Sequence, residues 1–289
     1  MSTLWQNIQY KILRSNSKLN LLIGINVAVY LLINIPATIE ETFFLTGYIT
    51  GFSDHYLLLP AYIPKLLTHF WTPFTYMFMH AGVFHILFNM LWLYWFGQIF
   101  EEYLGYKRTL GLYIMGGLMG ALFFVLSYNT IPAFTHANAA FYGTMVGASA
   151  SVMAIIIATA TLLPDYTISL ILIGPVKLKW LALFFIAMDF LGISGLNAGG
   201  EISHLGGALM GFIYIKQLKN GNDWIGNISK LFKPKSKLKV VSKNPLRPAG
   251  GVPRQEEIDF ILDKISRAGY DSLNKQEKEI LFRASNNEG

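Results

Sequence analysis

The chain has 289 residues, of which 53% are hydrophobic and 14% are charged, and its mean hydropathy is +0.41. This composition excludes an ordinary soluble domain, because several apolar runs approach the roughly 20 residues with which a helix spans a bilayer. The absence of cysteine excludes thiol catalysis, disulfide bonds and cysteine metal sites. The formal net charge of +6 arises largely from basic loops and a basic tail, so it does not indicate nucleic-acid binding.

Apolar runs along the chain predict six membrane-spanning helices, the first of which follows Lys11, Arg14 and Lys18. No small-residue cleavage site follows this first run, so we expect a retained span and not a signal peptide. The runs do not alternate apolar and polar residues as barrel strands do, and a backbone in lipid must then form helices. The predicted spans are residues 19–36, 83–103, 109–127, 143–163, 179–194 and 202–218.

Successive loops between the spans lie on opposite sides of the membrane, and basic residues are distributed unequally between the two sets of loops. One set, with the end of the last span, carries Lys107, Arg108, Lys177, Lys179, Lys216 and Lys219. In the other set, Lys65 is alone in 37–82, and 128–142 has no lysine or arginine. Basic loops stay on the cytoplasmic side. The sequence therefore predicts an integral protein of the lipid bilayer with both termini in the cytoplasm.

The chain changes character after the last span. A stretch rich in Lys, Pro, Gly and Ser predicts a solvated linker. Two short helices are expected after it, the first stopped by Gly269 and the second begun by a capping box of Asn274 and Glu277. The predicted organisation is a cytoplasmic N-terminus (1–18), a membrane domain (19–218), a basic flexible linker (219–254) and a small helical tail (255–289).

Polar residues inside the spans are the candidates for function, since polar groups in lipid are costly and usually functional. His85 and Asn89 open the second span, Ser149 lies about six residues into the fourth, roughly 9 Å deep, and His204 opens the sixth. These three spans run inward from the same face, so we expect all four side chains at one level. Three further polar residues lie nearby: His80, Ser151 and Ser203.

Glycine pairs suggest how these spans meet. Gly207 and Gly211 form a GxxxG pair beside His204, and Gly143 and Gly147 form another beside Ser149. Small residues at this spacing allow helix backbones to approach closely. We therefore expect Ser149 to face His204 across a tight helix contact.

A serine beside a histidine is the minimum for nucleophilic acyl transfer. His85, the Asn89 amide and the backbone N–H of Ser149 are candidate donors to the oxyanion. No third, acidic member is apparent: Asp189 lies well inside a span, and we expect it to face the membrane interface, with the orientation of His204 as the alternative. The alternative readings are structural, because buried serines often bond to their own backbone and His80 is expected to hold its loop.

The membrane part, about 19–218, resembles the rhomboid family of intramembrane serine proteases. The resemblance rests on three motifs in this order: His80, His85 and Asn89 as H-x4-H-x3-N, Gly147 to Ser149 as G-x-S, and His204, Gly207 and Gly211 as H-x2-G-x3-G. It implies an all-α, polytopic six-helix bundle that cuts membrane-anchored proteins near the outer membrane face, without a cofactor. The small helical tail resembles an extension found on some bacterial rhomboids, which implies a bacterial inner membrane.

The resemblance also implies residue roles. Ser149 is then the nucleophile and His204 the general base. His85, Asn89 and the backbone of Ser149 line the oxyanion hole, and His80 and Gly147 support the site. The tail holds no catalytic group, so a chain ending after Asn220 is expected to retain the chemistry.

Four positions depart from the family pattern. Ala150 stands where the family usually has glycine, Ser203 where it often has alanine, Met153 where it often has tyrosine, and Thr72 where it often has arginine. These departures leave open an inactive rhomboid-like protein that binds membrane clients.

Two further alternatives concern other classes of protein. A metal-dependent protease or transporter would use His80, His85 and His204, but their spacing is not a zincin pattern and no glutamate adjoins them. A channel or carrier would show paired broken helices in two inverted halves, and the sequence shows none.

Overall fold

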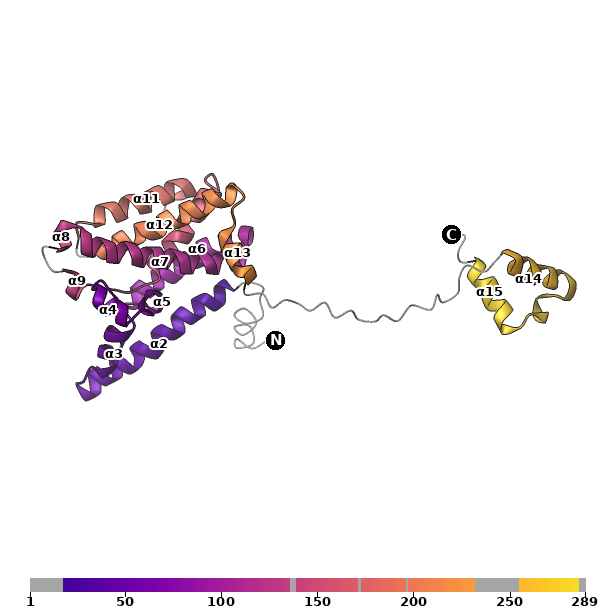
Figure 1. The fold of residues 1–289 in the computed structure, drawn as a ribbon, viewed down its shortest axis with the longest axis horizontal. Helices are drawn as coiled ribbons and strands as arrows, with labels where there is room; N and C mark the ends of the chain where they lie inside the picture. The colour runs from indigo at the N-terminus through magenta and orange to yellow at the C-terminus, as the bar shows by residue number, and fades with distance from the viewer. Residues whose placement is uncertain (1–17, 136–138, 171–172, 196, 232–254, 286–289) are drawn as a thin grey trace. The chain divides into compact units, whose positions relative to one another are not determined.

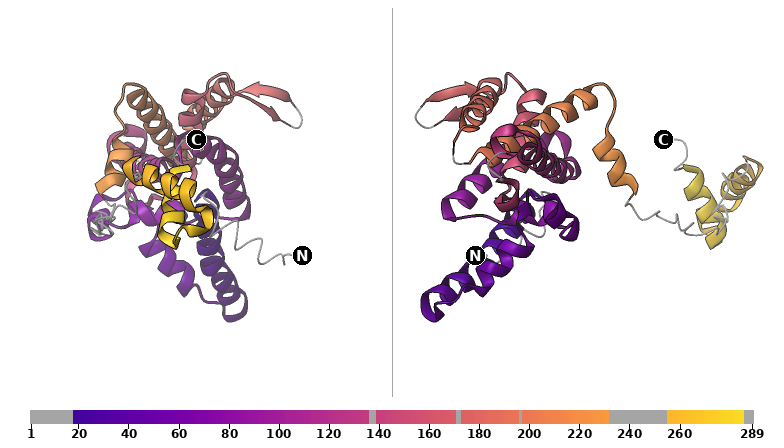
Figure 2. Two further views of the ribbon diagram at one scale, coloured as in Figure 1. Left: turned by 90° about the vertical axis from the view of Figure 1, so that its right-hand side faces the viewer. Right: turned by 60° about the vertical axis from the view of Figure 1, so that its left-hand side comes forward.

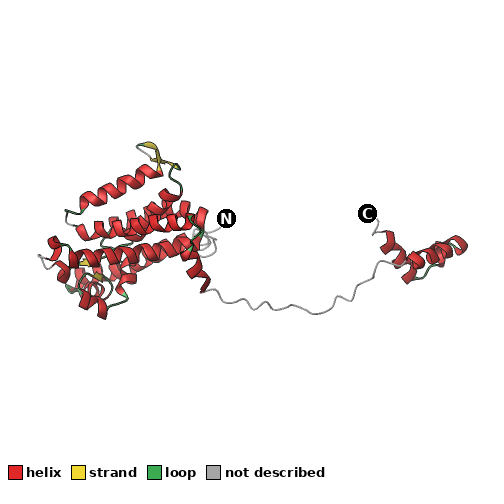
Figure 3. Cartoon of the chain, turned by 45° about the horizontal axis from the view of Figure 1, so that its top comes forward, coloured by secondary structure: helices red, strands yellow, loops and turns green. Residues whose placement is uncertain are grey.

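The fold is that of a computed structural model, which describes residues 18–135, 139–170, 173–195, 197–231 and 255–285. The described chain is mostly helical, and its strands are short (Figure 1, Figure 3). The prediction of an all-α protein is therefore confirmed. The chain divides into two compact units, residues 1–233 and residues 234–289.

The first unit is a bundle of long helices. Its main members are α2 (Leu19–Phe44), α6 (Val83–Leu104), α7 (Tyr106–Thr130), α10 (Ser149–Leu162), α11 (Leu178–Gly192) and α12 (Ala198–Lys219). Within the described residues, α2, α6 and α7 are long and apolar enough to cross a membrane, and α10 is a shorter apolar helix. The polytopic helical bundle is confirmed, and the count of six spans stays a prediction.

Short elements cover one end of this bundle, which we call the site end. Between α2 and α6 they are α3 (Tyr48–Tyr56), β1 (Leu59–Pro60), α4 (Ile63–Thr68), α5 (Thr72–Thr75) and the 3-10 helix η2 (Tyr76–Phe78). Between α7 and α10 they are α8 (Pro132–Thr135), α9 (Ala139–Tyr142) and β2 (Thr144–Met145).

The prediction for the start of the fourth span is wrong. β2 pairs antiparallel with β1, with Leu59 opposite Met145, so the chain enters this region as a strand. Gly147 then has φ +123°, a conformation that favours glycine and that no helix contains. α10 therefore begins at Ser149, which is the first residue of its helix and not six residues inside it. For the same reason, Gly143 and Gly147 are not a helix-packing pair.

α10 forms the centre of the bundle, with every residue from Ala150 to Ala160 buried. A side chain on Gly207 of α12 would overlap the carbonyl oxygen of Ala150, and one on Gly211 would overlap that of Ala154. The predicted close approach at Gly207 and Gly211 is thus confirmed, since only glycine leaves room for the backbone of α10.

The opposite end of the first unit, which we call the basic end, carries a hairpin of β3 (Thr167–Leu170) and β4 (Gly174–Lys177), which projects from the bundle (Figure 2). Asp165, just before it, accepts hydrogen bonds from Lys179 Nζ at 2.8 Å and Lys177 Nζ at 3.0 Å. These bonds lower the pKa of the Asp165 carboxyl. The two lysines predicted for one loop thus meet one carboxylate.

A further helix, α13 (Trp224–Leu231), lies where the sequence predicted a flexible linker, so that prediction is wrong for these residues. Arg108 donates to Asp223 Oδ2 from Nε at 3.0 Å and from Nη2 at 2.6 Å. The other carboxyl oxygen accepts the Gly226 N–H at 2.9 Å. Burial acts against ionisation, but these bonds outweigh it and lower the pKa of Asp223. Residues 232–254, the rest of the predicted linker, lie outside the described residues.

The second unit contains α14 (Gln255–Ala268), the 3-10 helix η3 (Tyr270–Ser272) and α15 (Lys275–Ser285). The predicted capping box is confirmed: the Glu277 N–H donates to Asn274 Oδ1 at 2.9 Å, and the Asn274 N–H donates to Glu277 Oε2 at 2.8 Å. Gly269, predicted to end the first helix, follows α14 with φ +78°. Lys264 also donates to Glu277, and this bond lowers the pKa of that carboxyl.

Candidate active site

The four polar residues that the sequence placed at one depth line a single cavity of about 660 Å³ at the site end. His85 and Asn89 come from α6, Ser149 from α10 and His204 from α12. Asp189 of α11 lines the same cavity. The structure therefore brings together side chains from four helices. The first of them, His85, and the last, His204, are 119 positions apart in the sequence.

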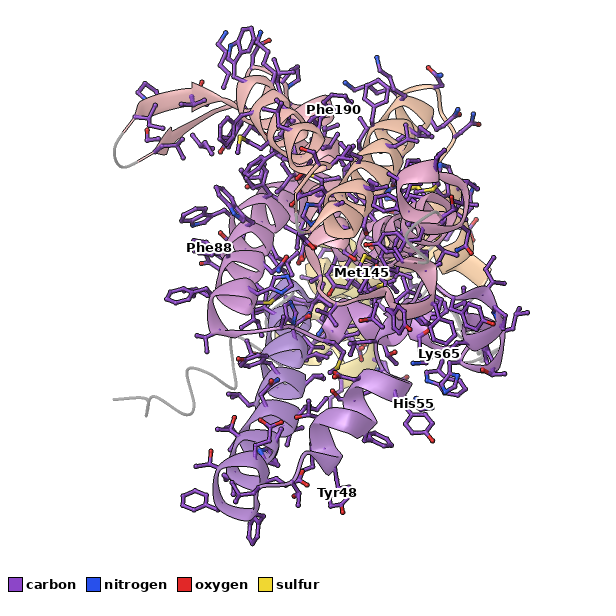
Figure 4. The ribbon with its side chains drawn as sticks, turned by 90° about the vertical axis from the view of Figure 1, so that its left-hand side faces the viewer. Tyr48, His55, Lys65, Phe88, Met145 and Phe190 are labelled. Atoms are coloured by element: carbon purple, nitrogen blue, oxygen red, sulfur yellow. The ribbon has the colours of Figure 1, made fainter. Side chains whose placement is uncertain are left out.

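The rest of the wall is largely apolar, with Phe84, Phe88, Trp92, Met153, Ile156 and Phe185 among its residues. Figure 4 faces the site end: Met145, which also lines the cavity, lies near the centre, to the right of Phe88 and below Phe190. Polar groups in such a cavity interact more strongly than they would in water, because little solvent screens them.

Ser149 stands at the N-terminus of α10. The first backbone hydrogen bond of this helix runs from the Val152 N–H to the Ala148 carbonyl, at 2.9 Å. The N–H groups of the first turn, that of Ser149 included, have no acceptor within the helix. A helix N-terminus with free N–H groups attracts negative charge. The Gly147 N–H is engaged elsewhere, since it donates to the Tyr76 carbonyl at 3.0 Å.

His85 lies directly beside this helix start. Its Nδ1 accepts the Ala81 N–H at 3.4 Å, so a neutral ring carries its proton on Nε2. A side chain on Gly147 would lie 2.8 Å from His85 Nε2 and 3.5 Å from Ser149 Oγ. Glycine at this position thus serves the backbone turn and also leaves space for the histidine next to the serine.

Asn89 and His80 have different surroundings. The Asn89 Nδ2 donates to the His85 carbonyl one turn earlier at 2.9 Å, which leaves one amide hydrogen for another acceptor. His80 is buried outside the cavity lining, donates from Nδ1 to the Phe78 carbonyl at 3.3 Å, and packs edge-on against the His85 ring at 5.3 Å. These contacts fit the supporting position predicted for His80.

His204 is bonded to the carboxylate that sequence reasoning set aside. His204 Nδ1 donates to Asp189 Oδ1 at 3.0 Å, and Glu201 Oε2 lies 3.5 Å from the same nitrogen. The prediction that Asp189 faces the membrane interface is therefore wrong. An isolated carboxylate inside an apolar span was a signal in the sequence that Asp189 has a function. The sequence did not indicate the rotation of α11 about its axis, which turns this carboxylate toward α12.

Ser149 and His204 share the cavity, but the hydrogen bonds of the described residues include none between the two side chains. In enzymes without substrate, the bond between nucleophile and base is often long and tightens when substrate binds. Ser151, the other serine of this stretch, is buried and does not line the cavity.

The departures from the family pattern fit the packing around the site. A side chain on Gly120 of α7 would overlap Ala150 Cβ and lie 2.6 Å from Ser203 Oγ. Ala150 and Ser203, two of the four departures, thus pack against the same glycine, and the missing side chain of Gly120 leaves room for both. Met153 lines the cavity, and Thr72 is buried with its hydroxyl donating to the His69 carbonyl at 2.8 Å.

The described residues contain one group with metal-ligand spacing. Ligand atoms of Asp189, Glu201 and His204 lie within 4.8 Å of one another. This group differs from the three histidines that the sequence offered for a metal, because it contains neither His80 nor His85. Oxygen and nitrogen donors of this kind suit a divalent cation, so a metal-based reading has to be tested on these three residues.

Comparison with known proteins gives two family matches. The Rhomboid domain matches residues 67–220, more than half of the chain, and a family of unknown function (DUF6576) matches residues 252–287. The second match falls on the predicted helical tail.

Individual relatives agree with the first match. RHOMBOID-like protein 12, mitochondrial, of Arabidopsis thaliana is 31% identical over 157 residues, covering 52% of this chain and 47% of that protein. Presenilin-associated rhomboid-like protein A, mitochondrial, of Danio rerio is 32% identical over 145 residues, covering 48% and 35%. Inactive RHOMBOID-like protein 8 of Arabidopsis thaliana is 36% identical over 84 residues, covering 29% and 23%. The chain thus spans less than half the length of each of these relatives.

Proposed function

The chain belongs to the rhomboid family, whose domain is a polytopic helical membrane bundle, and from this premise we propose that it is an intramembrane serine endopeptidase. Its substrates are membrane-anchored proteins, cut at or near the outer membrane face. The observation that carries the proposal is the shared cavity in which Ser149 begins a helix and His204 has its Nδ1 already bonded.

The geometry supports a simple division of roles. With Nδ1–H given to Asp189, His204 has Nε2 free to take the proton of Ser149 Oγ–H as the oxygen attacks the scissile carbonyl carbon. The same proton then passes to the leaving amine, and an acyl-serine forms. Water hydrolyses this ester with His204 again as base, which restores the Ser149 hydroxyl.

The developing oxyanion lies near fixed donors. The Nε2–H of His85, assigned by the bond at its Nδ1, faces the space beside Ser149 Oγ. The Ser149 N–H at the start of α10 and the second amide hydrogen of Asn89 complete the set. Such preorganised donors commonly contribute the largest part of catalysis in acyl transfer, roughly 10²–10³ in kcat for each donor.

The alternative is a catalytically inactive rhomboid-like protein that binds membrane clients. One relative is named an inactive rhomboid-like protein, so family membership does not decide between the two functions. The presence of both Ser149 and His204 in one cavity favours the protease.

The decisive test compares cleavage of a transmembrane reporter by the wild type, Ser149→Ala and His204→Ala. Each variant is expected to lose cleavage and remain folded, and Ser149→Ala also to lose labelling by a fluorophosphonate. Ser151→Ala is the matched control and retains activity, because its hydroxyl lies outside the cavity. Wild-type cleavage by Ser149→Ala would refute the assignment, and loss of activity with a chelator would favour the metal group instead.

We also propose the sidedness that the basic residues predict, with residues 19–218 as the membrane domain and both termini cytoplasmic. In intact bacteria, a cysteine at Thr135 should react with an impermeant thiol reagent, and one at Thr167 should not, since the chain has no cysteine of its own. The opposite labelling would reverse the topology. The bacterial inner membrane stays a prediction, and relatives named as mitochondrial do not support it.

A further inference from the structure

Asp189 is an unusual residue for its helix. α11 buries only Leu178, Leu181, Ala182 and Asp189, so the carboxylate is the one buried residue of its second half. Asp189 is 6% exposed. A carboxylate in such a place is costly unless a partner compensates for its lost hydration.

The partner is His204. Asp189 Oδ1 accepts from His204 Nδ1 at 3.0 Å, and Asp189 Oδ2 is buried with no hydrogen-bond donor among the described residues. His204 is therefore the hydrogen-bond donor that the described residues give this carboxylate, and the Glu201 carboxyl is its other polar neighbour.

Glu201 is the weaker neighbour of the same ring. Its Oε2 is 3.5 Å from His204 Nδ1, and its Oε1 accepts from Asn197 Nδ2 at 3.3 Å. Its side chain is 21% exposed, against 9% for Asp189. The shorter distance and the deeper burial both select Asp189 as the acceptor for His204.

We propose that Asp189 positions His204, so that the catalytic unit is a Ser149–His204–Asp189 triad and not a dyad; this rests on the function proposed above. By accepting Nδ1–H, Asp189 holds the ring in the tautomer whose Nε2 can take the serine proton. When that proton arrives, the carboxylate stabilises the imidazolium and itself stays ionised. Asp189 touches no reacting atom and is a positioning residue.

A structural role alone would give a different result. If Asp189 only held α11 against α12, its loss would lower stability or substrate affinity but leave the serine as reactive as before. If it positions the base, its loss lowers kcat and slows the reaction of Ser149 with a fluorophosphonate, while KM changes little.

The test uses the full chain in detergent, with Asp189→Asn, Asp189→Ala and Asp189→Glu. For the first two we expect kcat and the labelling rate to fall by about 10²- to 10⁴-fold, the range for loss of general base efficiency. Asp189→Glu, which keeps a carboxylate, should recover part of the loss. Asp165→Asn, an exposed carboxylate at the basic end, is the matched control and should behave as wild type.

The outcomes separate this proposal from the function on which it rests. If Ser149→Ala retains wild-type cleavage, the protease assignment fails. If Ser149→Ala is inactive while Asp189→Asn keeps wild-type kcat and labelling rate, only the triad fails. A larger loss in Glu201→Gln than in Asp189→Asn, or a requirement for a divalent cation, would also overturn the triad. Should Asp189→Ala not fold, the isosteric Asp189→Asn decides.

Discussion

Helices α10 and α11 are neighbours in the sequence, similar in length and both strongly apolar, yet they occupy opposite environments. α10 is buried from Ala150 to Ala160, whereas α11 buries four residues and exposes large side chains, Phe184 and Phe190 among them. The difference lies in side-chain size. Six of the 14 residues of α10 are alanine or serine, whereas seven of the 15 residues of α11 are leucine or phenylalanine.

Hydropathy therefore does not tell which apolar helix is central in a membrane bundle, because lipid tails are as apolar as a protein interior. Small residues indicate the central helix, because they allow helix backbones to pack in contact with one another. In this chain each kind of helix also contributes one group to the site, Ser149 from the central helix and Asp189 from the peripheral one. Four experiments can break or sharpen this comparison, and they run from the largest expected effect to the smallest.

Gly207→Ala should have the largest effect, because the new methyl group would overlap the Ala150 carbonyl. Overpacking of this kind lowers the free energy of unfolding by about 1–3 kcal/mol, and here it also shifts the turn that carries Ser149. We expect a lower melting temperature in detergent and a loss of cleavage. Gly51→Ala, in α3 with nothing within 4 Å of the new Cβ, should change neither. Equal melting temperatures and equal cleavage by the two variants would contradict the close contact between α12 and α10 at Gly207.

Ile155→Ala and Leu183→Ala compare the two helices directly. Ile155 is fully buried in α10, and Leu183 on α11 is 55% exposed. We expect a loss on the order of 2 kcal/mol for the first, from the cavity it leaves, and under about 0.5 kcal/mol for the second. Thermal unfolding of both proteins in one detergent gives the comparison. A larger loss at Leu183 would mean that α11 packs against something on its outer face.

Two C-terminal truncations test whether α13 belongs to the helical bundle. A chain ending after Lys233 keeps α13, and it should match the full chain in cleavage of a reporter in detergent. A chain ending after Asn220 loses Asp223 and Ile225, of which Ile225 packs against Gly111 of α7. It should melt at a lower temperature, while the expectation from the sequence that it retains the chemistry is tested by the same reporter. Identical melting of the two truncated chains would show that α13 is dispensable.

The ion pair at α13 should give the smallest effect, on the order of 1 kcal/mol, since both partners retain some solvent contact. The Asp223 carboxyl has a lower pKa in the folded than in the unfolded chain. Its stabilisation is therefore complete above the unfolded value near 4 and is lost as the pH falls through the lowered folded value.

We expect acidification from about pH 5 to pH 3 to lower the melting temperature of the wild type more than that of Asp223→Asn. Asp165→Asn, at a more exposed pair of lysine contacts, is the comparison variant and should change the acid dependence less than Asp223→Asn, because solvent screens an exposed pair. Parallel curves for the wild type and Asp223→Asn would show that this carboxyl does not contribute to the acid dependence.

Much of the architecture could be predicted from local sequence. Runs of apolar residues locate the long helices, and the Gly207 and Gly211 spacing indicates the close contact with α10. The meeting of Ser149, His85, Asn89 and His204 followed from topology alone, because residues at the same ends of parallel spans must share a level.

What could not be predicted depends on long-range or rotational information. The strand before Ser149 exists because Met145 pairs with Leu59, far away in the chain, and the apolar local sequence is equally compatible with helix. The bond between Asp189 and His204 depends on the rotation of α11 about its axis, which an evenly apolar helix does not reveal. The start of α13 is held by Asp223, which accepts hydrogen bonds from Arg108 and from the Gly226 N–H. In the sequence, Arg108 served only as a basic residue that indicates the cytoplasmic side.

The separation of the site residues along the chain has a consequence for biosynthesis. Proteins are made from the N-terminus, so His85 and Ser149 are translated before Asp189 and His204. A ribosome-bound chain that ends before residue 204 therefore holds Ser149 without His204. Under the proposed mechanism, the nascent protease remains inert toward neighbouring membrane proteins until its last helix is inserted, and no inhibitor or propeptide is needed to silence it during synthesis.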